Sequence, residues 1–373
     1  MKISYINGVC VHHDAISNAI RDELGFLNDA GYRDVHLYTH ACDYSDLPHS
    51  CVERTSNIAL SPHFQASDIV VFHFGVYYPL FDLLPAAPKG SKRIVVFHNV
   101  TPKELVPSRD HWLIEKSFVQ LDNIRWADRV VCDSTSNLQV LEGRGIRTDA
   151  VVVPLAITSA LAAPETKPSF DDDQIRIAFV GRFTRAKGPQ DLLRAMECVL
   201  RREQRCSALA GRVRLDLIGN LQFSDASLLA QLDHDIRRLR ESFPQLEIHL
   251  QGNASDQLKH SILASADMFV LPTYHEGFCV PIIEAIASGC SVVAYGNSNV
   301  PAITGGLARL VATADIDALA GAVVSGMAQV RSHDWRQGEA SGYRRYLQGA
   351  RAHVAQFAPP VVARRFLDAL SLA

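Results

Sequence analysis

Short apolar runs alternate with helical patterns of apolar residues along the whole chain. In the first half these runs are Ile3–Ile6, Val35–Tyr38, Ile69–Phe74, Arg93–Phe97, Arg129–Cys132 and Val151–Val153. Between the first two runs, apolar residues recur at helical spacing, at Ile16, Ile20, Leu24 and Leu27. Gly31 then stands where a left-handed helix cap belongs. This alternation predicts an α/β domain in which crossover helices connect the strands of a parallel sheet.

The pattern is interrupted once and then repeats. Residues 154–174 are rich in Pro, Ala and polar residues without a clean period, which is typical of an interdomain linker. A second series of strand-like runs follows, at Ile175–Val180, Val213–Ile218, Leu246–Leu250, Met268–Leu271, Ser291–Tyr295 and Ala308–Val311. A chain of 373 residues is expected to form two domains of this size. The sequence therefore predicts a first domain at 1–160, a linker at 161–174 and a second domain at 175–356.

Composition narrows the classes of function. The chain has 37 Lys and Arg against 40 Asp and Glu, so it lacks the basic excess of a nucleic-acid-binding protein. Its 8 cysteines form no C-x-x-C pair, which indicates reduced thiols in a cytoplasmic protein. The apolar stretch 69–88 contains His73, Asp82 and two prolines. Such a stretch favours a buried strand and an irregular loop over a transmembrane helix, and it leaves open a peripheral contact with the inner membrane.

The most informative segment is residues 271–284, LPTYHEGFCVPIIE. It leads from the end of an apolar strand into a helix that Pro281 can begin, and ligands of open α/β sheets bind at such strand ends. Glu276 lies in the loop, and Glu284 lies about one turn into the helix. An anion could be met here by the backbone N–H groups of Gly277, Phe278 and Cys279. Spacing alone equally allows a helix-entry acid at Glu276 and a solvated Glu284.

A second segment of the same half combines a glycine turn with two cations. Residues 178–188, AFVGRFTRAKG, run from a strand through Gly181 to Arg182 and Lys187, ahead of an amphipathic helix. Basic residues at a helix start are unfavourable for the helix dipole, but two cations there suit a bound diphosphate. A solvated loop is the alternative.

Candidate polar residues of the first half follow its strands. His98 lies just beyond a strand in VVFHNVTP, where an imidazole can orient a hydroxyl or a phosphate, and His73 occupies a similar place in VVFHFG. The loop at residues 7–17 contains Gly8, which fits a phosphate contact or an ordinary tight turn. The same loop contains Asp14, which also fits a helix N-cap. A lone loop histidine is more often structural or solvated.

Two patterns that suggest metal sites carry little weight. The acidic run Asp171–Asp173 contains a D-x-D spelling, but it precedes a strand instead of following one. The residues His12–Asp14 are adjacent, and adjacent side chains seldom converge on one ion. We therefore expect no metal ion and no cofactor.

These motifs together resemble those of glycosyltransferase family 4 (GT4), and the likeness covers nearly the full chain. It includes the E-x7-E segment with its Glu-Ala-x-Ala-x-Gly continuation to Gly289, the G-R-x-x-x-x-K-G pattern from Gly181, the post-strand His98 and the strand-helix segment 127–141. The resemblance implies the GT-B fold, in which two Rossmann-like doubly wound domains face each other across a cleft. It also implies that a C-terminal helix, here at about 357–373, packs back on the first domain.

The resemblance implies roles for these residues in a retaining, metal-independent glycosyltransferase of a bacterial, mannosyltransferase-like kind. Glu276 would hold donor-sugar hydroxyls, Glu284 the ribose, Arg182 with Lys187 the leaving diphosphate, and His98 the reaction centre. Gly8 would contact the donor, although many relatives have a glycine pair where this chain has only Gly8. Asp14 and His73 are assigned to the acceptor side.

The implied substrates are a nucleotide-diphosphate sugar and a glycan or lipid-linked saccharide of surface polysaccharide synthesis. GDP-mannose is the first candidate donor, and a UDP-sugar is the second. A nucleotide-sugar 2-epimerase, a phosphorylase and a non-catalytic GT-B subunit are alternatives. An NAD-linked oxidoreductase fits less well, because no G-x-G-x-x-G follows the first strand.

Overall fold

The computed structural model describes residues 1–157, 163–172, 174–205, 212–221, 224–338 and 340–372. They divide into two compact units. The first comprises Met1–Thr158 together with Phe357–Ala373, and the second comprises Ser159–Gln356. The predicted linker at 161–174 lies only partly inside the described residues, and Asp173 and Cys206 lie outside them.

The first unit is built on a parallel sheet with the strand order β5-β3-β1-β6-β7-β8-β9. Its strands are β1 (Lys2–Ile6), β3 (Asp34–Thr39), β5 (His49–Cys51), β6 (Ile69–Phe74), β7 (Lys92–Phe97), β8 (Arg129–Cys132) and β9 (Ala150–Val152). Every run predicted for this half forms a strand, to within one residue. The edge strand β5 and the small pair β2 (Val9–Cys10) and β4 (Ala41–Cys42) were not predicted, because two or three residues carry no visible period.

Successive side chains of these strands face two different cores. On one face, Ile69 and Val71 of β6 pack with α1 (Ala15–Asp29) and α15 (Pro359–Leu370). On the other face, β6 packs with the 3-10 helices η1 (Pro79–Ala86) and η4 (Leu121–Trp126). Strands covered on both faces require unbroken apolar runs, which explains why the sequence shows runs instead of alternation. Helix α15 joins the first unit through this packing.

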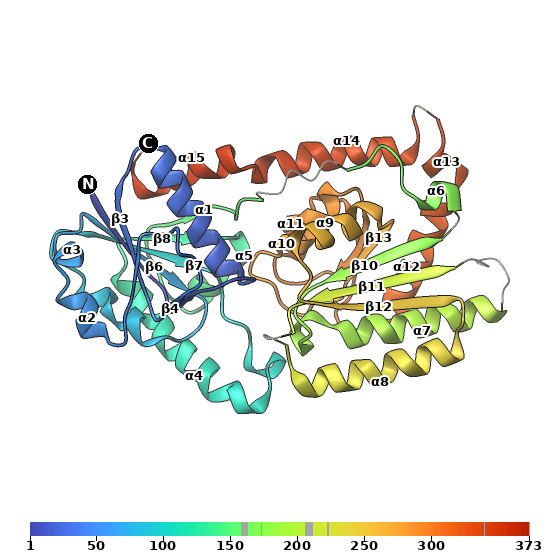
Figure 1. The fold of residues 1–373 in the computed structure, drawn as a ribbon, viewed down its shortest axis with the longest axis horizontal. Coiled ribbons are helices and arrows are strands. Elements are labelled where there is room, and N and C mark those ends of the chain that lie inside the picture. The colour runs from blue at the N-terminus through green and yellow to red at the C-terminus, as the bar shows by residue number, and fades with distance from the viewer. Residues whose placement is uncertain (158–162, 173, 206–211, 222–223, 339, 373) are drawn as a thin grey trace. The chain divides into compact units, whose positions relative to one another are not determined.

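The second unit repeats the architecture with the strand order β12-β11-β10-β13-β14-β15. Its strands are β10 (Ile175–Val180), β11 (Val213–Gly219), β12 (Leu246–Gly252), β13 (Met268–Leu271), β14 (Ser291–Tyr295) and β15 (Ala308–Val311). Figure 1 shows α7 (Pro189–Arg205) and α8 (Ala226–Ser242) along one face, with α9 (Asp256–Ser265) and α10 (Val280–Ala287) along the other. Two parallel sheets covered by helices confirm the predicted α/β class.

The remaining helices complete the two units. They are α2 (Thr55–Ala59), α3 (Pro62–Gln65), α4 (His111–Gln120), α5 (Thr135–Gly143), α6 (Ser169–Asp172), α11 (Val300–Thr304), α12 (Ile316–Arg331), α13 (His333–Arg336) and α14 (Gly342–Val354). The short 3-10 helices are η2 (Lys103–Leu105), η3 (Ser108–Asp110), η5 (Arg185–Lys187) and η6 (Ala355–Phe357).

The apolar stretch 69–88 forms strand β6 followed by η1, so the loop expected after the strand is largely a 3-10 helix. Pro79 at the start of η1 explains this, because its fixed φ suits a first helical turn. Among the residues that the structure describes, no helix is long and apolar enough to cross a membrane.

Candidate functional site

The candidate site of the second unit lies where the strand order changes direction. β10 pairs with β11 on one side and with β13 on the other, so the loops that follow β10 and β13 begin next to each other at one edge of the sheet. Ligands of doubly wound sheets bind at such switch points, beyond the carboxyl ends of the strands. Gly181 and Arg182 follow β10, and Glu276 lies in the loop after β13.

Gly188 allows these two loops to approach each other closely. Its φ is +66°, and a Cβ atom there would lie 2.0 Å from the carbonyl oxygen of Pro272. The loops are further joined by a hydrogen bond of 2.7 Å from the backbone N–H of Tyr274 to the carbonyl of Ala186. Only glycine fits this position without strain. The contact brings the end of η5 next to the loop that carries Glu276.

Lys187 and Glu276 form an ion pair at this junction. The Lys187 Nζ atom donates to Glu276 Oε1 at 2.6 Å, and the exposed fractions of the two side chains are 18% and 5%. Arg182 is exposed at the end of the same strand β10. The structure thus brings together Lys187 and Glu276 in one part of the second unit, as their positions at two strand ends predict. An ammonium has three donors, so Lys187 can hold this carboxylate and an anionic ligand together.

Glu284 has a partner that the sequence analysis missed. Its Oε1 accepts a hydrogen bond of 2.8 Å from Lys259 Nζ, and His260 Nε2 lies 3.8 Å from the same oxygen. Burial disfavours the Lys259 ammonium, but the Glu284 carboxylate outweighs it, and the pKa of Lys259 is raised. The two residues are 25 positions apart on α9 and α10, so no short motif links them. Glu284 is therefore a paired, buried carboxylate and not a solvated helix residue.

The N-terminal end of α10 is formed by a left-handed residue. Cys279 is the N-cap with φ 82°, and Pro281 lies in the first turn, as predicted. Burial raises the pKa of the Cys279 thiol well above its ordinary value, so it stays neutral. Asn299 Nδ2 donates to the carbonyl of Phe278 at 2.9 Å, which fixes the loop. The anion contact of the backbone at Gly277, Phe278 and Cys279 stays a prediction.

In the first unit, His98 and His73 belong to a buried row of polar groups. His98 Nδ1 lies 2.6 Å from Asp133 Oδ2, and His98 Nε2 lies 2.9 Å from His73 Nδ1. His73 Nε2 lies 3.1 Å from Glu23 Oε2. Both nitrogens of both rings therefore have partners inside the unit. His73 has no exposed surface, and all its described contacts are with residues of the first unit. Its contact with an acceptor stays a prediction.

The protonation states of this row follow from burial and neighbouring charge. Burial lowers the pKa of His73 well below its usual value. Burial also disfavours the His98 imidazolium, but the charge and hydrogen bond of Asp133 outweigh it and raise the pKa of His98. Burial raises the pKa of Glu23 to about 8. Glu23 and His98 thus each favour their protonated form, and His73 lies between them as a neutral imidazole with one ring proton.

Glu23 and Asp133 were missed although a signal was present. Three similar segments lie at or near the carboxyl ends of β6, β7 and β8, VVFH at 70–73, VVFH at 95–98 and VVCD at 130–133. The last residue of each segment is His73, His98 or Asp133. The register of β7 and β8 places Asp133 beside His98, while His73 pairs with Val96, two residues before His98 and on the same face of the sheet. Glu23 comes from a helix and has no such signal.

Asp14 and Gly8 have clear structural roles. Asp14 is the N-cap of α1, and its Oδ2 accepts hydrogen bonds from Ser17 N at 2.9 Å and Ser17 Oγ at 2.7 Å. The carbonyl of Gly8 accepts from His40 N at 2.9 Å, and a Cβ there would lie 3.2 Å from the Tyr78 side chain. These contacts explain both residue types without a ligand, and their assignment to the site stays a prediction.

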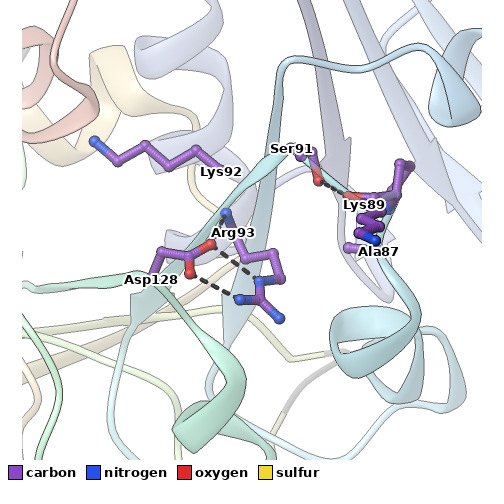
Figure 2. A pocket seen from close by; sticks show the side chains of 8 residues that line it. Ala87, Lys89, Ser91, Lys92, Arg93 and Asp128 are labelled. Atoms are coloured by element: carbon purple, nitrogen blue, oxygen red, sulfur yellow. Dashed lines mark hydrogen bonds and ion pairs between the residues drawn. The ribbon is translucent and has the colours of Figure 1, made fainter.

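A pocket of about 490 Å³ in the first unit lies away from these groups. Figure 2 shows Lys89, Lys92, Arg93 and Asp128 around it, and the Arg93 guanidinium donates two hydrogen bonds to Asp128, at 3.0 and 2.7 Å. Lys92 begins β7, so the pocket lies at the amino ends of the strands. Ligands of such sheets bind at the opposite edge, which argues against this pocket as the functional site.

The acidic run at 171–173 is a structural feature where it is described. Asp172 in α6 forms an ion pair with Arg176, whose hydrogen bond lowers the pKa of Asp172. In the described part of the chain, no three His, Cys, Asp or Glu side chains are grouped so that they could hold a metal ion.

Part of the second unit is similar in sequence to known proteins. Residues 174–329 match the profile of the family "Glycosyl transferases group 1". An MMP alpha-(1->4)-mannosyltransferase of Mycolicibacterium hassiacum is 39% identical over 75 residues, which cover 19% of this chain and 18% of that protein. An O-antigen chain mannosyltransferase B of Escherichia coli is 28% identical over 90 residues, covering 24% of this chain and 23% of that protein. The chain thus matches less than a quarter of either relative's length.

Solved structures match the whole chain. Sucrose-phosphate synthase from Thermosynechococcus elongatus has a TM-score of 0.71 at 17% identity, covering 99% of this chain and 98% of that one. Anabaena HepE, solved with UDP-glucose, has a TM-score of 0.72 at 16% identity, and each chain is covered fully. These likenesses show that the fold is GT-B. The sequence match to the glycosyltransferase family lies within the second unit.

Proposed function

We propose that the protein transfers a sugar from a nucleotide-diphosphate sugar to a saccharide acceptor. The observation that carries this proposal is the Lys187–Glu276 pair at 2.6 Å, at the switch point of the sheet that matches the glycosyltransferase family. A cation and a carboxylate at one strand end suit the two parts of such a donor. The cation suits the diphosphate, and the carboxylate suits the hydroxyls of the sugar.

The proposed donor-binding residues all belong to the second unit. Lys187 and Arg182 neutralise the charge that grows on the leaving diphosphate, which is where preorganised donors lower a barrier most. Glu276 holds sugar hydroxyls, and Glu284 holds the ribose while Lys259 keeps it in place. The turn at Gly181 and the N-terminal end of α10 at 277–279 complete the donor contacts. In the first unit, Gly8 is proposed to contact the donor, and Asp14 and His73 are proposed to act on the acceptor side.

His98 is the proposed catalytic residue of the first unit. Because Asp133 and His73 occupy both of its ring nitrogens, His98 reaches a reacting hydroxyl only after its Nε2 exchanges His73 for that hydroxyl. The His98 side chain is buried, which restricts the movement of its ring while Nε2 changes its hydrogen-bond partner.

We infer a retaining, metal-independent reaction without a cofactor. Two cations in the donor site do the electrostatic work that a bound divalent ion does elsewhere. Activity with excess EDTA should therefore equal activity without it. Loss of activity in EDTA that Mg²⁺ or Mn²⁺ restores would overturn metal independence. Product anomers, assigned by NMR, test retention.

GDP-mannose is the proposed donor, with a UDP-sugar second, and the proposed acceptor is a glycan or lipid-linked saccharide of surface polysaccharide synthesis. Two mannosyltransferases among the relatives support mannose, while a structural neighbour holding UDP-glucose supports the second option. The protein is proposed to act in the cytoplasm, in contact with the inner membrane when its acceptor is lipid-linked.

A thermal-shift screen of GDP, UDP, ADP and dTDP tests the donor site. A nucleotide at about 100 times its Kd should stabilise the protein by roughly 2.7 kcal/mol, and Lys187→Met should abolish the shift. No shift with any nucleotide would contradict the proposal. Incubation of the nucleotide sugar without acceptor separates a transferase from a 2-epimerase, which would convert the donor alone.

A further inference from the structure

The polar groups of the first unit form one row on a single face of its sheet. Within β6, His73 faces the same side as Ile69 and Val71, since side chains alternate along a strand. The register pairs His73 with Val96 and Phe97 with Cys132, so His98 lies two residues beyond Val96 on the same face, and Asp133 lies beside His98. Glu23 reaches the row from α1, which covers this face.

Two arrangements of protons fit the hydrogen bonds of this row. In one arrangement, the Glu23 carboxylic acid donates to His73 Nε2, His73 Nδ1–H donates to His98 Nε2, and His98 Nδ1–H donates to Asp133. In the other, His98 is an imidazolium that donates through Nε2 to His73 Nδ1, and His73 Nε2–H donates to the Glu23 carboxylate. In both arrangements each of the three hydrogen bonds in the row has one donor and one acceptor. The four side chains hold the same number of protons and carry one net negative charge in total.

We propose that Glu23, His73 and Asp133 are positioning residues that lock the His98 ring and exchange one proton with it inside the fold. The role of this exchange in sugar transfer rests on the proposed function above. In the exchange, the Glu23 proton bonds to His73 Nε2 while the His73 Nδ1 proton moves to His98 Nε2. No proton enters or leaves, and the reverse step restores Glu23. His98 thus gains or loses its positive charge without a solvent proton.

The surroundings of the row favour this exchange. Asp133 Oδ1 is buried without a hydrogen-bond partner in the described residues, and Asp133 and Glu23 line one cavity of about 20 Å³. Two carboxylates so close repel each other unless a positive charge lies between them. Other titratable groups near the row are Tyr5, whose ring stacks on His73, Asp14, whose charge favours the imidazolium, and Asp22, which lines the same cavity as Glu23 and Asp133. One proton is therefore divided between Glu23 and His98 and titrates as a property of the pair.

A row that only holds the fold together makes a different prediction from a row that sets the charge of His98. In the first case, isosteric changes of the carboxyl groups alter stability alone. In the second case, they alter the affinity of His98 for its proton. Glu23→Gln and Asp133→Asn are the suitable changes, because each keeps the size of the side chain and removes its charge.

Histidine 15N NMR of the full chain between pH 5 and 9 measures that affinity. The His98 signal is identified by its loss in His98→Gln. We expect His98 to titrate above its ordinary pKa in the wild type, with at least a tenfold lower proton affinity in Asp133→Asn and a smaller loss in Glu23→Gln. Glu115→Gln, at an exposed carboxylate, is the matched control and should change nothing. Equal proton affinity in wild type and Glu23→Gln, with unfolding still cooperative, would overturn the exchange.

The pH profile of kcat then tests the role in the reaction. If His98 acts as proposed, the limb of the profile that reports on His98 moves in Glu23→Gln by the same factor as the NMR titration, and KM changes little. A moved NMR titration with an unmoved kcat profile would overturn the role in sugar transfer and leave the exchange itself supported. Glu23→Gln keeps the test available if Asp133→Asn fails to fold.

Discussion

At the scale of single residues, the contribution of Lys187 to stability can be separated from its proposed role in catalysis. Its ammonium pairs with Glu276, which is largely buried, so Lys187→Met leaves an unpaired carboxylate as well as removing the proposed diphosphate contact. We expect a loss of roughly 2–4 kcal/mol of transition-state stabilisation, measured as kcat/KM, by comparison with removal of one oxyanion donor. Glu276→Gln added to Lys187→Met should restore thermal stability but not activity. Recovered activity in the double variant would contradict the proposed role.

Glu23 should give the protein a measurable dependence of stability on pH. Its pKa is raised from the ordinary 4.5 to about 8, so between these pH values the folded state binds more protons than the unfolded state. The contribution of Glu23 to the free energy of unfolding is therefore present in full below pH 4.5 and falls as pH rises toward 8. Chemical denaturation at pH 5 and at pH 8 should show Glu23→Gln gaining stability relative to the wild type at the higher pH. A constant difference would mean that the pKa is not raised.

At the scale of elements, Gly188 holds the loops after β10 and β13 together. Gly188→Ala should destabilise the second unit by several kcal/mol, because it adds a clash with Pro272 to the roughly 1–2 kcal/mol cost of a left-handed residue. Gly306→Ala is the control, since its φ is +78° and nothing lies within 4 Å of the added Cβ. Urea denaturation measures both. Equal losses would show that the close approach is unimportant.

The same scale shows what the sequence could predict. Strands buried on both faces leave unbroken apolar runs, so β6, β7, β10 and β13 are readable from residue order alone. The pairing of Lys259 with Glu284 and of Glu23 with His73 is not, because each joins elements that only the tertiary fold brings together. Asp133 lies between these cases, since its strand ending repeats that of His98 but an aspartate after a strand is common.

At the scale of the whole molecule, the chain passes from the first unit into the second and then returns to the first. Its last helix, α15, packs in the core of the first unit. Phe366 of α15 is 2% exposed in that core, so Phe366→Ala should cost about 3–5 kcal/mol. The loss should fall on the first unit, while a bound nucleotide should protect the second. Hydrogen exchange with mass spectrometry separates them. Peptides of β1 and β6 should exchange faster in Phe366→Ala, and peptides of β10 and β13 should exchange more slowly with the nucleotide. If instead both changes spread evenly over all four strands, the two units unfold as one, and stability cannot be assigned to either alone.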